Sequence, residues 1–156
     1  MIATVINKKI YLRAVKPADL LTLMPMVRAF YRHFSYPFDL KEKMIALQQL
    51  VESRNIGRVW RIRQGDEDIG YVLVAFTFSL EYGGRVAMID ELYVNQEGRQ
   101  TGIGSMVLNK VELICQRIGI NIFQLETEPH NQRATALYNR LGYRDYGRNL
   151  LTKITR

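Results

Sequence analysis

The segment VAMIDELYVNQEGRQTGIGSMVLNKVELICQRI, residues 86–118, decides the fold because it passes from a strand pattern to a helix pattern across one short loop. Residues 86–94 are mostly apolar, which is typical of a buried strand. The loop that follows contains Gly98, Gly102 and Gly104. Apolar residues then recur at helical spacing, at Ile103, Val107, Val111, Ile114 and Ile118. The segment therefore predicts a strand, a glycine-bearing loop and a helix, in that order.

The residues before this segment predict a strand, two helices and two further strands. Strand patterns occupy 9–15 and 58–64, and a longer apolar run marks a third strand over 69–80. Pro17 suits the first turn of a helix, which Pro25 should kink or split. A second helix should follow, opened by a capping box of Asp39 and Glu42. Turn residues between the strands indicate an antiparallel meander.

The residues after the segment predict another strand, a short helix and a last strand. An apolar strand is expected over 121–127, a helix capped by Asn131, and a final strand or hairpin over 144–154. This order of elements predicts a mixed α/β fold, with a central, mostly antiparallel sheet of six to seven strands. About four helices should cover its two faces, and residues 1–156 should form a single domain.

Composition places the chain among globular proteins and limits its chemistry. Its 156 residues are 47% hydrophobic and 24% charged, which excludes a disordered or fibrous protein. Its apolar runs are strand-sized, whereas a membrane span needs roughly 20 residues. Cys115 has no second cysteine for a disulfide, and two histidines with one cysteine cannot complete a zinc site. We therefore expect a cytoplasmic protein that needs no metal and contacts no membrane.

The net charge of +7 would suit nucleic acid, an anionic membrane surface or a phosphate-rich small molecule. The basic residues are spread along the chain rather than gathered on one helix face or in a tail. The aromatic motif of a common RNA-binding domain is also missing from the sequence. A solvated basic surface is therefore the simpler interpretation, and nucleic acid is an unlikely partner.

The glycine-bearing loop has the features of a phosphate-binding site. The helix that follows it offers free backbone N–H groups in its first turn, and its dipole favours a negative charge there. Gly102 and Gly104 lack the Cβ atoms that would keep an anion away, and Arg99 adds a positive charge. The dinucleotide fingerprint and the nucleoside-triphosphate P-loop are both missing. A tight turn into a packed helix would explain these glycines equally well.

Three stretches in fixed order resemble the GCN5-related N-acetyltransferase (GNAT) superfamily. They are Ile89-Asp90-Glu91-Leu92-Tyr93-Val94, Arg99-x-x-Gly102-x-Gly104 and Asn131-x-x-Ala134-x-x-Leu137-Tyr138-x-x-x-Gly142-Tyr143. The resemblance implies acetyl-coenzyme A (acetyl-CoA) as co-substrate, in a cleft where the parallel strands 86–94 and 121–127 splay apart. The cofactor-binding residues that it implies are Leu92, Tyr93, Val94, Arg99, Gln100, Thr101, Gly102, Ile103, Gly104, Ser105, Asn131 and Tyr138.

The same resemblance implies the catalytic residues. Tyr138 stands where the family has its general acid, which returns a proton to the leaving thiolate. Glu91 is implied as a base that acts through an ordered water. Because neighbours on a strand point to opposite faces, Asp90 and Glu91 can both line the cleft only if a bulge intervenes. The base is thus open between Glu91, Asp90 and an ordered water.

The expected reaction is direct transfer of an acetyl group from acetyl-CoA to a primary amine. An acyl-enzyme is not expected, since Cys115 lies outside the motif. The acceptor stays open among small amines, polyamines, aminoglycosides, amino acids and protein amines, and a homodimer is possible. The aromatic segment 30–38 is expected either to wall the acceptor side or to join the core. The alternative is a basic nucleic-acid-binding or regulatory module with a non-catalytic coenzyme A site.

Overall fold

The computed structural model describes residues 9–155. Within it the chain forms two compact units, the first ending at Glu126 and the second beginning at Thr127. The first unit contains the sheet and most of the helices, and the second contains one helix and the C-terminal segment. Each unit is described by itself below.

A five-stranded sheet forms the centre of the first unit, with its strands side by side in sequence order. The strands are β1 (Ile10–Ala14), β2 (Gly57–Gln64), β3 (Glu67–Ser79), β4 (Gly84–Val94) and β5 (Ile122–Leu125). Neighbours from β1 to β4 are antiparallel, and β5 runs parallel to β4. These pairings confirm the expected mixed, mostly antiparallel sheet.

The parallel pairing of β4 is short, because β5 ends at Leu125 instead of continuing to the expected residue 127. β4 and β5 pair from Val86 and Ile122 to Ile89 and Leu125, while β4 continues to Val94. The last residues of β4 therefore have a partner strand on one side, β3, and none of the described strands on the other. This open backbone edge is where the fold can accept an extended ligand.

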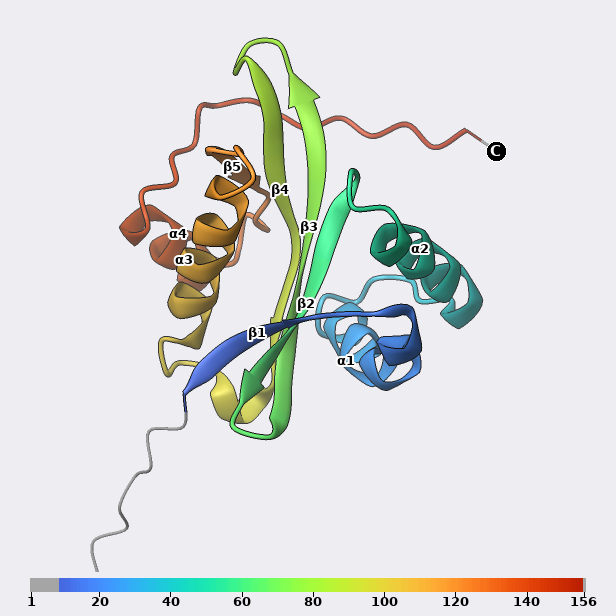
Figure 1. Ribbon diagram of the computed structural model, residues 1–156. Coiled ribbons are helices and arrows are strands. Elements are labelled where there is room, and N and C mark those ends of the chain that lie inside the picture. The colour runs from blue at the N-terminus through green and yellow to red at the C-terminus, as the bar shows by residue number, and fades with distance from the viewer. Residues whose placement is uncertain (1–8, 156) are drawn as a thin grey trace, which may run out of the picture. The chain divides into compact units, whose positions relative to one another are not determined.

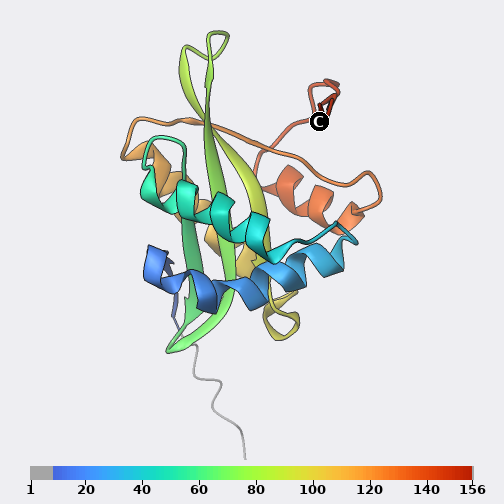
Figure 2. The same cartoon turned by 90° about the vertical axis from the view of Figure 1, so that its right-hand side faces the viewer.

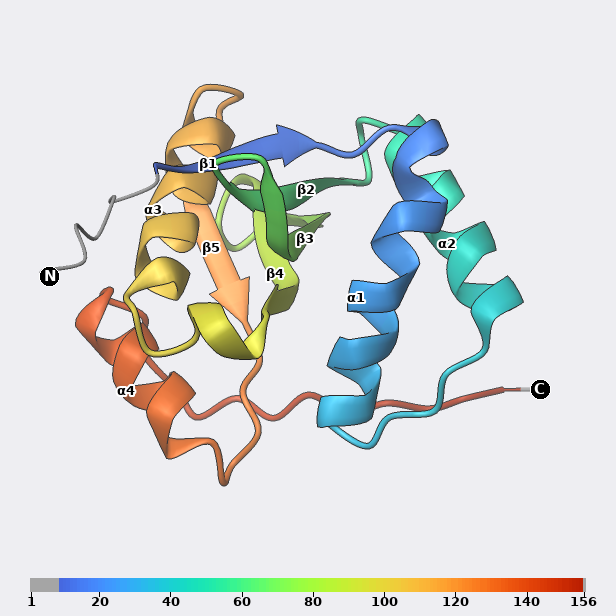
Figure 3. The same cartoon turned by 90° about the horizontal axis from the view of Figure 1, so that it is seen from below.

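Helices cover both faces of this sheet. α1 (Leu20–His33) and α2 (Leu40–Glu52) lie on one face and α3 (Ile103–Gln116) lies on the other (Figures 1 and 3). Figure 2 shows α1 and α2 running side by side across the sheet. Short 3₁₀ turns, η1 (Pro17–Asp19) and η2 (Gln96–Gly98), precede α1 and follow β4. None of the helices between residues 9 and 155 is long and apolar enough to cross a bilayer.

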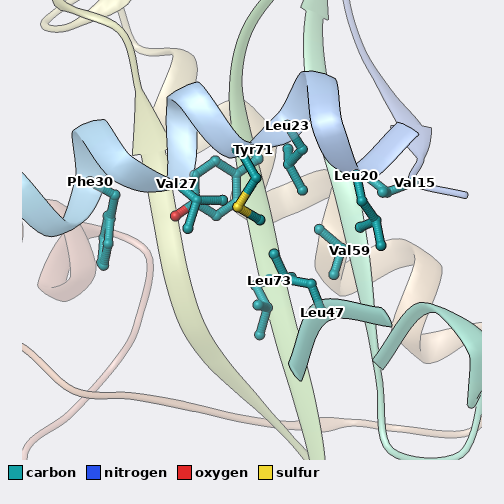
Figure 4. Close-up of a cluster of buried hydrophobic side chains, with 10 residues drawn as sticks. Val15, Leu20, Leu23, Val27, Phe30, Leu47, Val59, Tyr71 and Leu73 are labelled. Carbon is teal, nitrogen blue, oxygen red and sulfur yellow. The ribbon is translucent and has the colours of Figure 1, made fainter. Parts of the chain in front are cut away.

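The core beneath α1 and α2 follows from helical spacing. Leu23 and Val27 lie one turn apart on α1, and both are at most 2% exposed. They pack with Leu47 of α2 and with Tyr71 and Leu73 of β3, as Figure 4 shows. The phenol of Tyr71 is thereby carried into an otherwise apolar layer, where its hydroxyl needs a partner.

Pro25 does not split α1, which was one of the two effects expected of it. The helix continues from Leu20 to His33 with Pro25 inside it. A proline removes the hydrogen bond to the carbonyl four residues earlier, here that of Leu21. Leu21 and Pro25 are both exposed, so water can bind this carbonyl and the loss is tolerated.

The second unit contains α4 (Gln132–Arg140), which Asn131 caps as predicted: the Ala134 N–H donates to Asn131 Oδ1 at 3.1 Å. The predicted strand over 144–154 is wrong, because residues 144–155 contain no strand. A strand needs a neighbouring backbone for its hydrogen bonds, and in this segment Tyr146, Leu151 and Ile154 are more than three-quarters exposed. The sheet therefore has five described strands instead of six to seven.

Candidate active site

A β-bulge at Asp90 sets the geometry of the candidate site. Leu73 of β3 pairs with Glu91, but its neighbour Val74 pairs with Ile89, so Asp90 is an extra residue on β4. The bulge breaks the alternation of side chains along the strand. Asp90 and Glu91 consequently line the same pocket, which regular alternation forbids.

Glu91 is a buried carboxylate held by the phenol of Tyr71. Its residue is 8% exposed, and the fully buried Tyr71 hydroxyl donates to Glu91 Oε2 at 2.7 Å. Tyr31 of α1 lines the same pocket and lies close enough to influence this carboxylate. Burial raises the pKa of Glu91 above its usual range, although the hydrogen bond from Tyr71, the nearby Tyr31 hydroxyl and the charge of Lys43 act in the opposite direction. Glu91 is thus a stronger base than an ordinary glutamate.

The pocket beside Glu91 is small and has two chemically different ends. It has a volume of about 270 Å³ between α1, α2 and the sheet and is open to solvent on one side. Its polar lining includes Tyr31, Lys43 and the two carboxylates. Most of the other lining residues are aliphatic. Lys43 Nζ lies 4.9 Å from the centre of the Tyr31 ring. Partial burial raises the pKa of Asp90 as well.

The predicted phosphate-binding loop leads directly into α3. Gly102, the residue before the helix, has φ +80°, a left-handed conformation that favours glycine. No described side chain caps this end of α3, so the N–H groups of 103–105 face away from the helix without a capping partner. A Cβ atom built on Gly102 would meet no described atom within 4 Å. The loop thus offers backbone donors next to open space, as an anion site requires.

Arg99 connects this loop to the open edge of β4. Its Nε donates to the Val94 carbonyl at 2.9 Å, and its guanidinium lies 5.7 Å from the centre of the Tyr93 ring. The other edge of Leu92, Tyr93 and Val94 is paired with β3. An extended ligand that pairs with the Val94 carbonyl would therefore have to replace the hydrogen bond from Arg99 Nε.

The two remaining predicted site residues, Asn131 and Tyr138, belong to the second unit. Asn131 caps α4, and Tyr138 lies on the same helix with its ring 5.9 Å from that of Tyr143. Tyr138 is half-buried, and burial raises the pKa of its phenol. The phenol is therefore protonated at neutral pH, as a general acid must be.

Sequence reasoning missed Tyr71 and Lys43, and it placed Tyr31 only within an aromatic segment. Within that segment, Tyr31 lines the pocket, Phe30 is part of the core and Tyr36 is exposed. One signal was present: a tyrosine inside a strand buried on both faces requires a polar partner for its hydroxyl. Which residue that partner is depends on the pairing of β3 with β4.

The chain matches the sequence model of the acetyltransferase (GNAT) family over residues 24–143. It belongs to this family. The match includes the pocket, the bulge, the glycine loop and α4, so the resemblance of the three motifs is confirmed. Members of the family use acetyl-CoA to acetylate an acceptor, which assigns the chain to the N-acetyltransferases.

Relatives agree with this assignment. An uncharacterized N-acetyltransferase of Bacillus subtilis, YhfO, is 24% identical over 86% of this chain and 89% of its own length. The thialysine N-epsilon-acetyltransferase of the pig is 37% identical, but the match spans 53% of this chain and only 48% of the pig enzyme. An integron cassette protein from a salt-marsh metagenome has the same fold, with a TM-score of 0.82, 27% identity and coverage of 93% and 90% of the two chains.

Proposed function

We propose that this protein transfers an acetyl group directly from acetyl-CoA to a primary amine, with Glu91 as base and Tyr138 as general acid. The observation that carries the proposal is the environment of Glu91. Its carboxylate is buried, has a raised pKa and lines a pocket at the point where β4 leaves β5. A base of this kind is needed, because amines of ordinary basicity arrive as ammonium ions.

The first task of these residues is to remove a proton from the acceptor. An alkylammonium ion has a pKa near ~10.4, so its neutralisation at pH 7 costs about 4.6 kcal/mol. Glu91 accepts this proton, directly or through a water, and the raised pKa makes that transfer less unfavourable. Asp90 supplies a second negative charge in the same pocket, which attracts the ammonium form.

The bond changes then balance without a covalent enzyme intermediate. The amine nitrogen forms a bond to the thioester carbon, the carbon–sulfur bond breaks, and Tyr138 gives its proton to the departing thiolate. The nitrogen loses its second proton as it becomes an amide, and an equivalent proton returns to Tyr138 through solvent. Backbone N–H groups on the open edge of residues 92–94 are the proposed donors to the carbonyl oxygen. Cys115 does not compete as a nucleophile, because its side chain is fully buried and burial raises its pKa to about 11.

The glycine loop is proposed to hold the diphosphate of the co-substrate. The N–H groups of 103–105 and the charge of Arg99 supply the donors, and the left-handed Gly102 keeps the approach open. Leu92, Tyr93 and Val94 would offer their free backbone edge to the extended arm of the same molecule. Gln100, Thr101 and Asn131 complete the proposed binding residues.

The test compares Glu91→Gln with the control Glu67→Gln, an exposed glutamate at the start of β3. Thiol release from acetyl-CoA is followed over a panel of amines and a range of pH. Glu91→Gln should lower kcat/KM by about 10²–10⁴-fold and abolish the acidic limb of the pH profile. Both variants should keep the rise in Tm that acetyl-CoA produces.

Two results would contradict the proposal. If millimolar acetyl-CoA left the Tm of the wild-type protein unchanged, the co-substrate site would be wrong. If Glu91→Gln kept the wild-type kcat/KM and pH profile while Tyr138→Phe did the same, neither residue would have the proposed role. A fall in kcat with unchanged KM for acetyl-CoA in Tyr138→Phe would support the general acid.

A further inference from the structure

The pocket beside Glu91 restricts which amine can serve as acceptor. We infer, on the basis of the proposed function, that the acceptor is a slender aliphatic monoamine, bound as its ammonium ion between Asp90 and Glu91 with an uncharged tail along α2. The inference rests on the size of the pocket, on the placement of its charges and on the direction in which it extends from Glu91.

The volume of the pocket limits how much of the acceptor it can surround. About 270 Å³ accommodates roughly nine groups of water size, at ~30 Å³ each. This lies just below the usual range for drug-sized ligands, which begins at about 300 Å³. A chain of about nine non-hydrogen atoms would fill the pocket, whereas most of a multi-ring aminosugar would remain outside it.

The charges of the pocket lie at one end. Asp90 and Glu91 are the only carboxylates among its lining residues, and the bulge places them next to each other. Lys43, the one cationic lining residue, lies 4.9 Å from the centre of the Tyr31 ring and also pairs with Glu42 at 3.5 Å. One ammonium group matches this arrangement, since a second cation close by would be repelled by Lys43.

The opposite end is aliphatic. Ala75 lies two residues beyond Leu73 on β3, about 7 Å from the position paired with Glu91. Ile56 precedes the β2 residue that pairs with Ala75, and Leu50 lies about two helical turns beyond Lys43 on α2. All three line the pocket. Ile56 is 46% exposed, so a second ammonium at this distance would lose only part of its water, but it would find no carboxylate among the lining residues, whereas methylene groups gain from contact with the aliphatic side chains.

A series of unbranched alkylamines of increasing length tests the inference. Each methylene buried at the aliphatic end should raise kcat/KM about fourfold, the ratio that corresponds to 0.8 kcal/mol. The gain should stop when the pocket is full, near nine non-hydrogen atoms. A diamine of equal length should have a kcat/KM at least tenfold lower than that of the monoamine, because its far charge loses water without gaining a partner.

Two variants of α2 locate the effect in this pocket. Ala46 lines the pocket and is exposed at its mouth, so Ala46→Phe should fold and should shift the best substrate to a shorter chain. Ile45→Phe, at the exposed neighbouring position outside the pocket, should leave the optimum unchanged. Melting curves check that both variants fold. If Ala46→Phe does not fold, the alkylamine series on the wild-type protein still tests the inference.

The outcomes separate this inference from the proposed function. A flat series, or a higher kcat/KM for the diamine or for a multi-ring aminosugar, would overturn the aliphatic monoamine while acetyl transfer stood. Failure of the wild-type protein to bind acetyl-CoA would instead overturn the proposed function, and the inference with it. Calorimetric titration of octylamine into the protein measures binding without turnover. Ala46→Phe should weaken the binding of octylamine, and Ile45→Phe should leave it unchanged.

Discussion

The hydrogen bond from Tyr71 to Glu91 makes the stability of the protein depend on pH in a specific way. The Tyr71 hydroxyl is fully buried and lies 2.7 Å from Glu91 Oε2, so Tyr71→Phe removes one donor from a buried carboxylate. A hydrogen bond to a charged group contributes about 1.5–3 kcal/mol, and one between neutral groups about 0.5–1.5 kcal/mol. The substitution should therefore cost about 1.5–3 kcal/mol at pH 8 and only about 0.5–1.5 kcal/mol at pH 4.

The direction of the pH effect follows from linkage. The pKa of Glu91 is already raised in the folded protein, so folding binds this proton more tightly than the unfolded chain does. The free energy of unfolding thus falls as pH rises from the ordinary glutamate range through the raised pKa. Removing the Tyr71 donor raises the pKa further, which extends this fall to higher pH and deepens it.

Urea unfolding at pH 4 and pH 8 measures the cost of Tyr71→Phe to the free energy of unfolding. NMR titration of the Glu91 carboxyl measures the change in its pKa. The control is Tyr11→Phe, because the Tyr11 hydroxyl donates to the neutral Gly65 carbonyl at 2.9 Å and its loss should cost the same at either pH. The reasoning is refuted if Tyr71→Phe has the same cost at pH 4 and pH 8 and leaves the pKa of Glu91 unchanged.

Four further outcomes follow from the structure. Gly102→Ala should cost about 1–2 kcal/mol, because φ is +80° there, and should raise the KM for acetyl-CoA; unchanged urea unfolding would contradict the left-handed turn. Asn131→Ala should cost about 1 kcal/mol by removing the cap of α4, and Asn131→Asp should restore it; equal hydrogen exchange over 132–140 in all three proteins would refute the cap. Arg61→Met should cost about 3 kcal/mol, since Asp68, 2.8 Å away, loses a partner in a largely buried pair; a cost under 1 kcal/mol in urea would show the pair to be dispensable. Cys115 should react with a thiol reagent at pH 8 at the rate of unfolding, because it is fully buried and its pKa is about 11; rapid modification of the native protein would contradict this burial.

Most of the secondary structure could be predicted because it depends on local repeats. The strand expected over 58–64 is observed as Gly57–Gln64, and the helix after the glycine loop begins at Ile103. The buried face of that helix was predicted less well. Leu108 and Cys115, which were not assigned to it, are fully buried, whereas Ile118, which was, is 39% exposed and lies beyond the end of the helix. Helical spacing alone defines a broad apolar face, and the packing against the sheet selects which part of it is buried.

The sequence by itself determined the family, the order of the strands and helices as far as α4, and the glycine loop with Gly102 before α3. These features need only short-range patterns, or motifs at fixed spacing along one chain. The tertiary structure decided that Asp90 and Glu91 share a pocket and that Tyr71 holds the carboxylate of Glu91. Both depend on the register between β3 and β4, which joins residues 20 positions apart and shifts by one at the bulge. No local pattern specifies that shift, because an extra residue on one strand is defined only by the strand that faces it.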